Sequence, residues 1–543
     1  MSDLSPEGAG EATSPAAAGP SRALARAGLI VTAAFFASRV LGYVRVEVFS
    51  AIFGVGARLD DYYAAFRIPD LVFQLVAAGA LGAALVPVLA GLFARGEDER
   101  AWRVLSTVVN LLAVALLILV VLAFLLAPWL VPIMNQLGPA DVQRTIELTR
   151  LMLLSPLFLT LGAVASSALN ALDLFTAAAV GPLLYNVAII GCAVLLAPTL
   201  GIESLAVGVV LGALLNALVQ VPQLVRHRGF NFRLRIDLRD PAAREALLLL
   251  IPRAIGLSVT QITFFVNTSL ATTLGAGALT AYTIAFTVFQ VPLGIIGLPL
   301  GVVLLPSLSR ARSVGAIHDF ATLTVRSVRL LLYVMLFLTA VAIVLRTEAI
   351  TLLFDYGRFE ASAIPVIADT LLVFLIGLAG QAIIIVLARA FYAAMDTRTP
   401  VLAAGLSVLV NVAVSITTVG PLGLRGLALG IAMGEWFEAA FLLALLARRA
   451  PGIDVGAIAR FGVVSLGGGL VAGLTAAAVM QTLLGVLGTA PGKLVMATES
   501  GVALAAAGLA FVGYSHLLRV PELAQTISLI RVALRRETPA ARR

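Results

Sequence analysis

The sequence is poor in the residue types that carry most chemistry in soluble proteins. Its 543 residues include one lysine, one cysteine and three histidines, and only 12% of them are charged. The single cysteine, Cys192, excludes an intrachain disulfide, and three scattered histidines give no metal-binding cluster. No nucleotide-binding loop is present, so an enzyme is not expected. Soluble domains carry about 25% charged residues, so an ordinary soluble domain is excluded.

Apolar residues dominate instead. They make up 60% of the chain, and the mean hydropathy is +1.04. A helix crosses the hydrocarbon core with about 20 apolar residues. The long runs are continuous rather than alternating, which predicts helices and not a β-barrel. We expect 14 membrane-spanning helices, at about 27–52, 61–94, 103–134, 144–171, 176–197, 203–225, 243–275, 279–309, 321–345, 363–395, 399–420, 424–448, 459–485 and 498–518.

The distribution of arginine predicts the orientation in the membrane. The net charge of +8 comes almost entirely from arginine, which gathers in every second connection, as in 95–103 and 226–244. By the positive-inside rule this side, with both termini, faces the cytoplasm. The basic balance suits anionic lipids as partners. No aromatic and basic recognition pattern indicates nucleic acid.

An internal repeat predicts two similar halves. LGAALVPVL at 81–89 matches LGVVLLPSL at 300–308, at an offset of 219 residues. Asn-Val-Ala at 186–188 and again at 411–413 follow in the same order. Six helices per copy give a parallel repeat about an axis normal to the membrane. The expected fold is an all-α polytopic membrane protein with two six-helix lobes and two C-terminal helices, suited to alternating access.

The predicted organisation of the chain follows from the repeat and from composition. The first residues are rich in Ser, Pro, Ala and Gly and lack the features of a signal peptide. We expect a disordered tail at 1–24, a first lobe at 25–225, a cytoplasmic linker at 226–242, a second lobe at 243–450, helices 13 and 14 in 451–519 and a basic cytoplasmic tail at 520–543.

Charged residues stand inside apolar sequence between Ser38 and Pro87. A charge at the bilayer centre costs roughly 2.5–3.5 kcal/mol on insertion scales, so such residues are functional candidates. The chain here resembles the MurJ/MviN family of lipid II flippases, a branch of the multidrug/oligosaccharidyl-lipid/polysaccharide exporter superfamily. The matching pieces are SRVLGYVR at 38–45, FGVGARLDDYYAAFRIPDL at 53–71, GALGAALVPVL at 79–89, LGVVLLPSLS at 300–309 and FYAAMDTRTPV at 391–401.

The resemblance implies a function and a location. It implies export of undecaprenyl-diphosphate-linked peptidoglycan precursor from the cytoplasmic to the periplasmic leaflet of the bacterial cytoplasmic membrane. No resident cofactor is implied; Na⁺ or H⁺ coupling, or the membrane potential, would drive transport, and cell-wall synthesis proteins are candidate partners. The diphosphate and carboxylates of such a substrate need fixed positive charge in the cavity, which arginine supplies through bidentate donors.

When the chain is compared with the family motif by motif, Arg39 and Arg45 match the two arginines of the first-helix motif. Asp60 matches the family's acidic residue at the start of the second helix. The two arginines are six residues apart, or about 120° around an ideal helix. They reach one cavity only if the helix bends, and Gly42 is the expected place. For Arg39, a structural ion pair is the alternative to substrate contact. For Arg45, the alternatives are an ion pair within the lobe and interfacial snorkelling.

Six positions depart from the family pattern, among them Ala78 and Val46, where the family commonly has an acidic residue. The family's arginine pair on the second helix falls at Phe73 and Gln74, and an Asp-Arg pair on the eighth falls at Phe286 and Thr287. Of three arginines proposed to cradle the diphosphate, only Arg45 remains. The departures leave two alternatives open: a flippase for another polyprenyl-linked glycan or cation-coupled exporter of the same superfamily, and a non-transporting cell-wall scaffold.

The second helix carries a polar stripe. Asp60, Tyr63, Arg67, Asp70 and Gln74 share one face by their spacing. We predict that this face lines the substrate cavity, with Asp60, Arg67 and Gln74 in contact with substrate. The alternative is an interfacial helix end whose charges reach water.

Two further residues and the tail complete the candidates. Arg253 is predicted to replace the missing arginine of the second lobe; snorkelling at the helix end is the alternative. Asp396 in DTRTP, with Val408, matches part of a Na⁺ site that some family members have; helix capping is the alternative. Residues 521–543 suit an amphipathic helix on anionic lipid, or a solvated tail.

Overall fold

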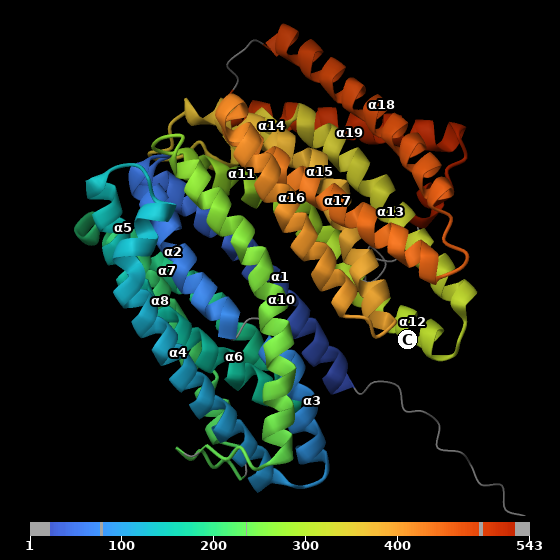
Figure 1. The fold of residues 1–543 in the computed structure, drawn as a ribbon. Helices are drawn as coiled ribbons and strands as arrows, with labels where there is room; N and C mark the ends of the chain where they lie inside the picture. Colours follow the sequence, from blue (N-terminus) through green and yellow to red (C-terminus); the bar gives the residue numbers. More distant parts are fainter. Residues whose placement is uncertain (1–21, 77–79, 228, 235, 488–491, 527–543) are drawn as a thin grey trace, which may run out of the picture.

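The structure is a computed structural model that describes residues 22–76, 80–227, 229–234, 236–487 and 492–526. Throughout these ranges the ordered elements are helices, and no strand occurs among them. Figure 1 shows two helical bundles that lean together at one end, with α18 and α19 on the outer side of the second. The expected tail at 1–24 and the basic tail at 520–543 fall mainly outside the described residues.

The first bundle is built from the N-terminal helices. They are α1 (Arg22–Phe53), α2 (Ala57–Val76), α3 (Ala80–Ala94), α4 (Asp98–Met134), α5 (Pro139–Met152), α6 (Ser155–Ala171), α7 (Phe175–Leu200), α8 (Glu203–Leu218) and the short α9 (Val221–Val225).

The remaining helices follow an extended connection. They are α10 (Pro241–Thr272), α11 (Ala278–Pro292), the π-helical turn η1 (Leu293–Gly297), α12 (Leu298–Ser313), α13 (Ile317–Val344), α14 (Arg346–Phe354), α15 (Ala363–Ala393), α16 (Arg398–Leu422), α17 (Leu424–Arg449), α18 (Val455–Leu487) and α19 (Lys493–Leu517). Helix α10 joins the two bundles, because it packs against α2, α3 and α4 of the first and against α16 of the second.

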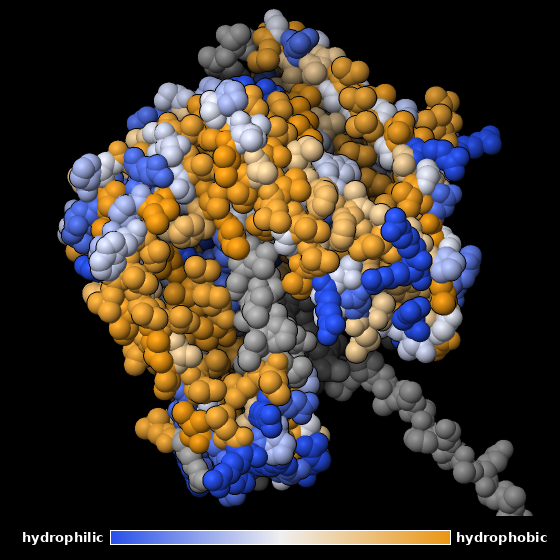
Figure 2. Space-filling view, in the orientation of Figure 1, coloured by the Kyte–Doolittle hydropathy of each residue, from blue (hydrophilic) through white to orange (hydrophobic). Residues whose placement is uncertain are grey.

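Within the described residues, 11 helical segments are long and apolar enough to cross a membrane. Large apolar side chains such as Leu117, Leu125 and Trp129 of α4 are exposed, as lipid-facing residues must be. Figure 2 shows apolar side chains over the middle of both bundles and hydrophilic ones at the ends. The chain is therefore a multi-pass membrane protein.

Two predicted segments are interrupted, and a proline stands at each break. The segment expected at 144–171 divides into α5 and α6, and Pro156 stands in the first turn of α6, where its missing N–H costs nothing. The segment expected at 279–309 is interrupted by η1 directly after Pro292, which cannot donate the regular helical hydrogen bond. In the segment expected at 61–94, α2 and α3 stand on either side of residues 77–79, which are outside the described residues.

Glycines allow the α16–α17 hairpin to pack closely. A Cβ on Gly426 would lie 2.5 Å from the carbonyl oxygen of Thr418. We expect Gly426→Ala to destabilise the fold by about 1–3 kcal/mol, because overpacking forces a backbone shift. Gly420→Ala is the matched control, since a Cβ there would meet nothing within 4 Å. Apparent melting temperatures of the purified variants test this; equal values would contradict the packing argument.

Candidate functional site

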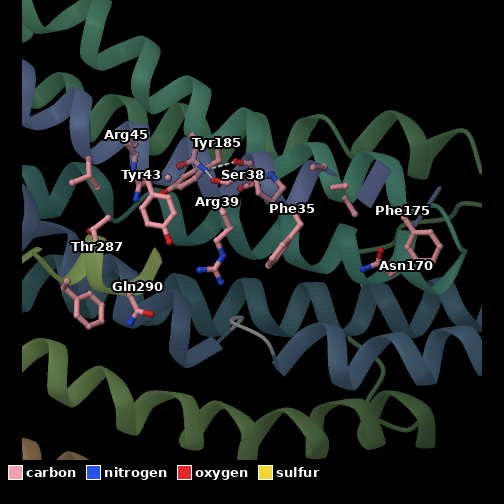
Figure 3. Close-up of a pocket in the computed structure, with 18 residues that line it drawn as sticks. Phe35, Ser38, Arg39, Tyr43, Arg45, Asn170, Phe175, Tyr185, Thr287 and Gln290 are labelled. Atoms are coloured by element: carbon pink, nitrogen blue, oxygen red, sulfur yellow. Dashed lines mark hydrogen bonds between the residues drawn. The ribbon is translucent and has the colours of Figure 1, made fainter. Parts of the chain in front are cut away.

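A cavity of about 620 Å³ lies where the first bundle faces the second. Its walls come from α1, the end of α6, α7 and α11, and Figure 3 shows the side chains that line it. The polar lining residues are Ser38, Arg39, Tyr43, Arg45, Asn170, Tyr185, Asn186, Thr287 and Gln290. No acidic residue is among the described residues that line the cavity.

Arg39 and Arg45 both line this cavity, although they are six residues apart on one helix. In Figure 3 the guanidinium of Arg39 points into the open space, toward Gln290 of α11. The Nε of Arg45 is buried and has no hydrogen-bond partner within the described residues. A buried, unpartnered donor on a charged group is costly. Arg45 therefore has free hydrogen-bonding capacity for an anion.

The π-helical turn η1 brings the second bundle close to these residues. A Cβ on Gly294 would lie 3.4 Å from the Tyr43 hydroxyl and 3.8 Å from Arg39 Nη1. Because glycine has no side chain, the turn leaves room for both groups. Single π turns inside α-helices are frequent at functional sites. Here the turn shapes the wall opposite Arg39.

Asp60 closes the molecule at one end by joining the two bundles. Its side chain is fully buried. One carboxylate oxygen accepts from the backbone N–H of Gly277 (2.6 Å), and the other accepts from the backbone N–H of Thr280 (2.7 Å) and from its hydroxyl (2.5 Å). Gly277 is the N-cap position of α11, where free N–H groups attract anions. We call this contact the Asp60 closure.

Other contacts between the bundles lie along the same interface. The Arg67 Nε donates to the Thr268 hydroxyl of α10 at 3.0 Å, and its guanidinium stands over the Phe264 ring at 5.2 Å. The Ser269 hydroxyl donates to the carbonyl of Ile133 at 2.5 Å. The backbone N–H of Arg358 donates to the carbonyl of Ala51 at 2.7 Å, beside the end of α1. These bonds reinforce the closed end.

The neighbouring Asp61 is buried within the first bundle. Its carboxylate accepts from Arg144 Nη1 at 2.6 Å and from Asn135 Nδ2 at 2.7 Å. The alternative that the polar stripe on α2 is an interfacial helix end whose charges reach water is wrong for Asp60, which is fully buried, as is Asp61 beside it.

Of the remaining candidates on α2, Arg67 lies at the contact between the bundles, whereas Gln74 bonds within its own helix. Gln74 Nε2 donates to Asp70 Oδ1 at 3.5 Å, one turn earlier on α2. Arg67 and Gln74 are not among the residues lining the cavity in this conformation. Substrate contact for Asp60, Arg67 and Gln74 stays a prediction. Arg253 lies on α10, and its side chain is outside the described residues.

Asp396 caps the start of α16. One of its oxygens accepts from the backbone N–H groups of Arg398 and Thr399, both at 3.0 Å. The other accepts from the Thr399 hydroxyl at 2.6 Å and pairs with Arg449 Nη1 at 2.5 Å. A cation needs free oxygen lone pairs, and here N–H and O–H donors and a guanidinium occupy both oxygens. This donor set does not fit Na⁺.

The contacts of Asp396 set its response to pH. Burial alone would raise the pKa of this carboxyl, but the hydrogen bonds from Thr399, Arg449 and the Arg398 backbone outweigh it and lower the pKa from 3.8 to about 2. A lowered folded-state pKa gives stability that is present above the unfolded pKa and lost as pH falls through the folded pKa.

We therefore expect Asp396→Asn to lower the apparent melting temperature by the same amount at all pH values between about 8 and 5. The difference from the unsubstituted protein should shrink only below about pH 4, where the unfolded carboxyl begins to bind protons. Melting curves across this range test the prediction. A difference that disappears near neutral pH would contradict it.

Several cavity residues escaped the sequence reasoning. Tyr43 stands within the SRVLGYVR motif, so the motif itself marked it. Asn186 on α7 was marked only as part of the internal repeat, whereas Tyr185 on α7 and Gln290 on α11 stand in apolar stretches without a motif. These residues lie near Arg39 and Arg45 only because α7 packs against α1 and α11 lies across the cavity from both helices.

Comparisons with known proteins give one consistent result. The model of the lipid II flippase MurJ family matches residues 49–498. A lipid II flippase MurJ from Burkholderia cenocepacia is 33% identical over 438 residues, which cover 78% of this chain and 84% of that protein. A probable lipid II flippase MurJ from Rhizobium tropici is 32% identical over 432 residues, with 78% and 80% coverage.

Solved structures show the same fold. The structure of a lipid II flippase MurJ in an inward closed conformation superposes with a TM-score of 0.75 at 20% identity, covering 90% of this chain and 98% of that one. An inward-facing multidrug resistance transporter of the MATE family gives a TM-score of 0.64 at 18% identity, with 78% and 96% coverage. At these identities the likeness concerns the fold alone.

Proposed function

The chain belongs to the lipid II flippase MurJ family, and we propose on this premise that it moves lipid II from the cytoplasmic to the periplasmic leaflet of a bacterial cytoplasmic membrane. The substrate is a lipid-linked peptidoglycan precursor with a diphosphate. The reaction is a transfer of position, without a chemical conversion of the substrate.

The observation that carries the proposal is the charge of the cavity. Two arginines and no acidic residue stand among its described lining residues. Keeping a guanidinium inside an apolar bundle without a carboxylate costs free energy. An anionic ligand offsets that cost through charge-assisted, bidentate hydrogen bonds, which match the geometry of a phosphate. Tyr43 and Gln290 add neutral donors around the same space.

We propose a topology of fourteen spans in two lobes. Eleven segments meet the criteria of length and hydropathy, and α1, the α2–α3 pair and α10 would complete the set. The arginine-rich connections α3–α4 and α12–α13 lie at the end away from the Asp60 closure (Figure 1), which supports placing that end, with both termini, in the cytoplasm. The Asp60 closure would then seal the periplasmic side.

In this arrangement transport requires two changes. Lipid II would enter the cavity from the cytoplasmic side and bring its diphosphate to Arg39 and Arg45. The Asp60 closure would then break while the opposite end of the bundles comes together. The driving force would be the membrane potential or an ion gradient, and binding energy at the arginines must differ between the two states for the substrate to bias them.

Rescue of a depleted strain tests the function directly. The chain is expressed in a bacterium from which the resident lipid II flippase is removed, and exposure of lipid II at the outer leaflet is measured. We expect growth and lipid II exposure to be restored. Correct insertion without rescue, in a host that makes the same precursor, would overturn the proposal. Retained binding of cell-wall proteins without lipid movement would support the scaffold alternative.

A further inference from the structure

The described residues of the connection between α9 and α10 contact the outside of α4. The backbone N–H of Arg233 donates to the Ser106 hydroxyl at 3.2 Å, and its carbonyl accepts from Asn110 Nδ2 at 2.8 Å. Arg100 holds the far end through two bonds to the carboxylate of Asp240, at 2.9 and 3.0 Å. Figure 1 shows this segment at the lower end of α4. We call residues 229–234 and 236–240 the linker strap.

The described residues of the linker strap alternate between apolar and polar. Phe230 packs against Trp102 of α4 with ring centroids 5.0 Å apart and fixes the start of the segment. The later apolar side chains are exposed: Phe232 44%, Leu234 92%, Ile236 45% and Leu238 54%. Hydrogen bonds to α4 hold the backbone so that these apolar side chains point outward. Exposing that many apolar side chains to water would be unfavourable, so the surface is expected to contact something apolar.

The middle of the linker strap lies close to the lipid-facing surface of α4. The exposed apolar side chains of α4 begin at Val114, and Asn110, which holds the strap, stands one turn earlier. One turn of helix is about 5–6 Å. The exposed tip around Leu234 therefore lies at the level where headgroups meet acyl chains, rather than in the aqueous phase.

A groove continues from the strap onto the first turns of α10. It has a volume of about 700 Å³ and is lined by Leu238, Arg239, Pro241, Arg244, Glu245 and Leu248. Neither Arg239 nor Arg244 makes a side-chain hydrogen bond or ion pair with a described residue, and both are exposed. One carboxylate, Glu245, also lines the groove, so its lining residues carry a net positive charge. Two leucines beside two arginines suit a phosphate joined to an acyl chain.

We propose that the linker strap and this groove dock on an anionic membrane surface. Phe232, Leu234 and Leu238 insert at the boundary between headgroups and acyl chains, while Arg239 and Arg244 bind the phosphate of an anionic phospholipid. The partner is thus a phospholipid of the bilayer, distinct from the transported substrate, and the proposal stands whether or not the chain flips lipid II. It anchors α10, the helix that joins the two bundles.

Insertion of the tip is tested with a fluorophore. Leu234→Cys in a Cys192→Ala background provides a single cysteine for an environment-sensitive label, and the full chain is placed in nanodiscs. In discs containing phosphatidylglycerol we expect blue-shifted emission that brominated acyl chains quench. Emission typical of water in every disc, without quenching, would overturn insertion. A label at exposed Arg58→Cys, on the far end of the bundle, serves as the unquenched reference.

Binding of the phosphate is tested by lipid retention. Native mass spectrometry of the full chain compares Arg239→Gln/Arg244→Gln with Arg310→Gln/Arg312→Gln, which removes the same charge from the end of α12. At about 1 kcal/mol for each arginine near an anionic surface, the first pair should weaken phosphatidylglycerol binding about 30-fold. The control pair should keep most of it. Equal loss in both pairs, or equal binding of phosphatidylcholine, would overturn the site.

Added lipid II separates the two possible sources of phosphate. If phosphatidylglycerol occupies the groove, excess lipid II should leave its retention unchanged, because lipid II binds at Arg39 and Arg45. Stoichiometric displacement that is lost in Arg239→Gln/Arg244→Gln would assign the groove to the substrate instead and overturn the proposal.

Discussion

Replacing Arg45 with alanine is expected to reduce lipid II flipping by about two orders of magnitude. Hydrogen bonds to charged groups contribute about 1.5–3 kcal/mol each, and a phosphate would take one or two from this guanidinium. The Nε of Arg45 is buried without a partner in the described structure, so truncation removes no internal hydrogen bond. The apparent melting temperature should therefore not fall. Transport of labelled lipid II into proteoliposomes measures the effect.

Two variants sharpen this test. Arg45→Lys keeps the charge but loses the planar pair of donors, so an intermediate rate is expected. Arg58→Ala removes an exposed arginine that does not line the cavity, and its rate should match that of the unsubstituted chain. If Arg45→Ala flips lipid II as fast as Arg58→Ala does, the cavity is not the diphosphate site.

Replacing Asp60 with alanine is expected to destabilise the closed end by about 3–5 kcal/mol, because three buried donors lose their acceptor and each costs about 1–3 kcal/mol when unsatisfied. The variant leaves two N–H groups and one hydroxyl of α11 without their acceptor. Spin labels at Ala140→Cys and Glu360→Cys, placed on the two bundles in a Cys192→Ala background, report the distance across this end. We expect a longer and broader distance distribution.

Substitutions on α11 provide the control. Thr280→Val removes only the hydroxyl that reaches Asp60, so it should widen the distribution to a smaller degree. Thr283→Val removes a hydroxyl that bonds within its own helix, to the carbonyl of Leu279, and should leave the distances unchanged. Distances that are the same in Asp60→Ala and Thr283→Val would show that the carboxylate does not hold this end closed.

The sequence predicts those parts of the site that are determined by residues close together in the chain, and not those that depend on contacts between distant segments. The motif around Arg39 and Arg45 placed both arginines on one helix, and both line one cavity. The role of Asp60 was hidden because its partners Gly277 and Thr280 are 217 and 220 residues away. The residues around Asp60 carry no pattern that shows its carboxylate binds the N-terminus of a distant helix.

The fold shows the same division. Continuous apolar runs predicted the helices well, because spanning a membrane imposes length and composition on each one separately. The breaks at Leu153 and Pro292 escaped, since hydropathy does not change across them. The position of α10 between both bundles also escaped. That position depends on which face of α10 packs against which bundle. A helix that is apolar on all sides gives no pattern from which its packing face can be predicted.

The π turn η1 has a consequence for the numbering of the helix that contains it. A π turn corresponds to one extra residue in an α-helix. Every later residue of the helix therefore takes the angular position that its predecessor would have in a regular α-helix. Ile295 in this turn is 56% exposed and makes a suitable residue to remove. Its deletion would restore a regular helix in which Ala278–Pro292 and Leu298–Ser313 each keep their present faces, whereas a deletion elsewhere in either helix would rotate one of them by about 100°.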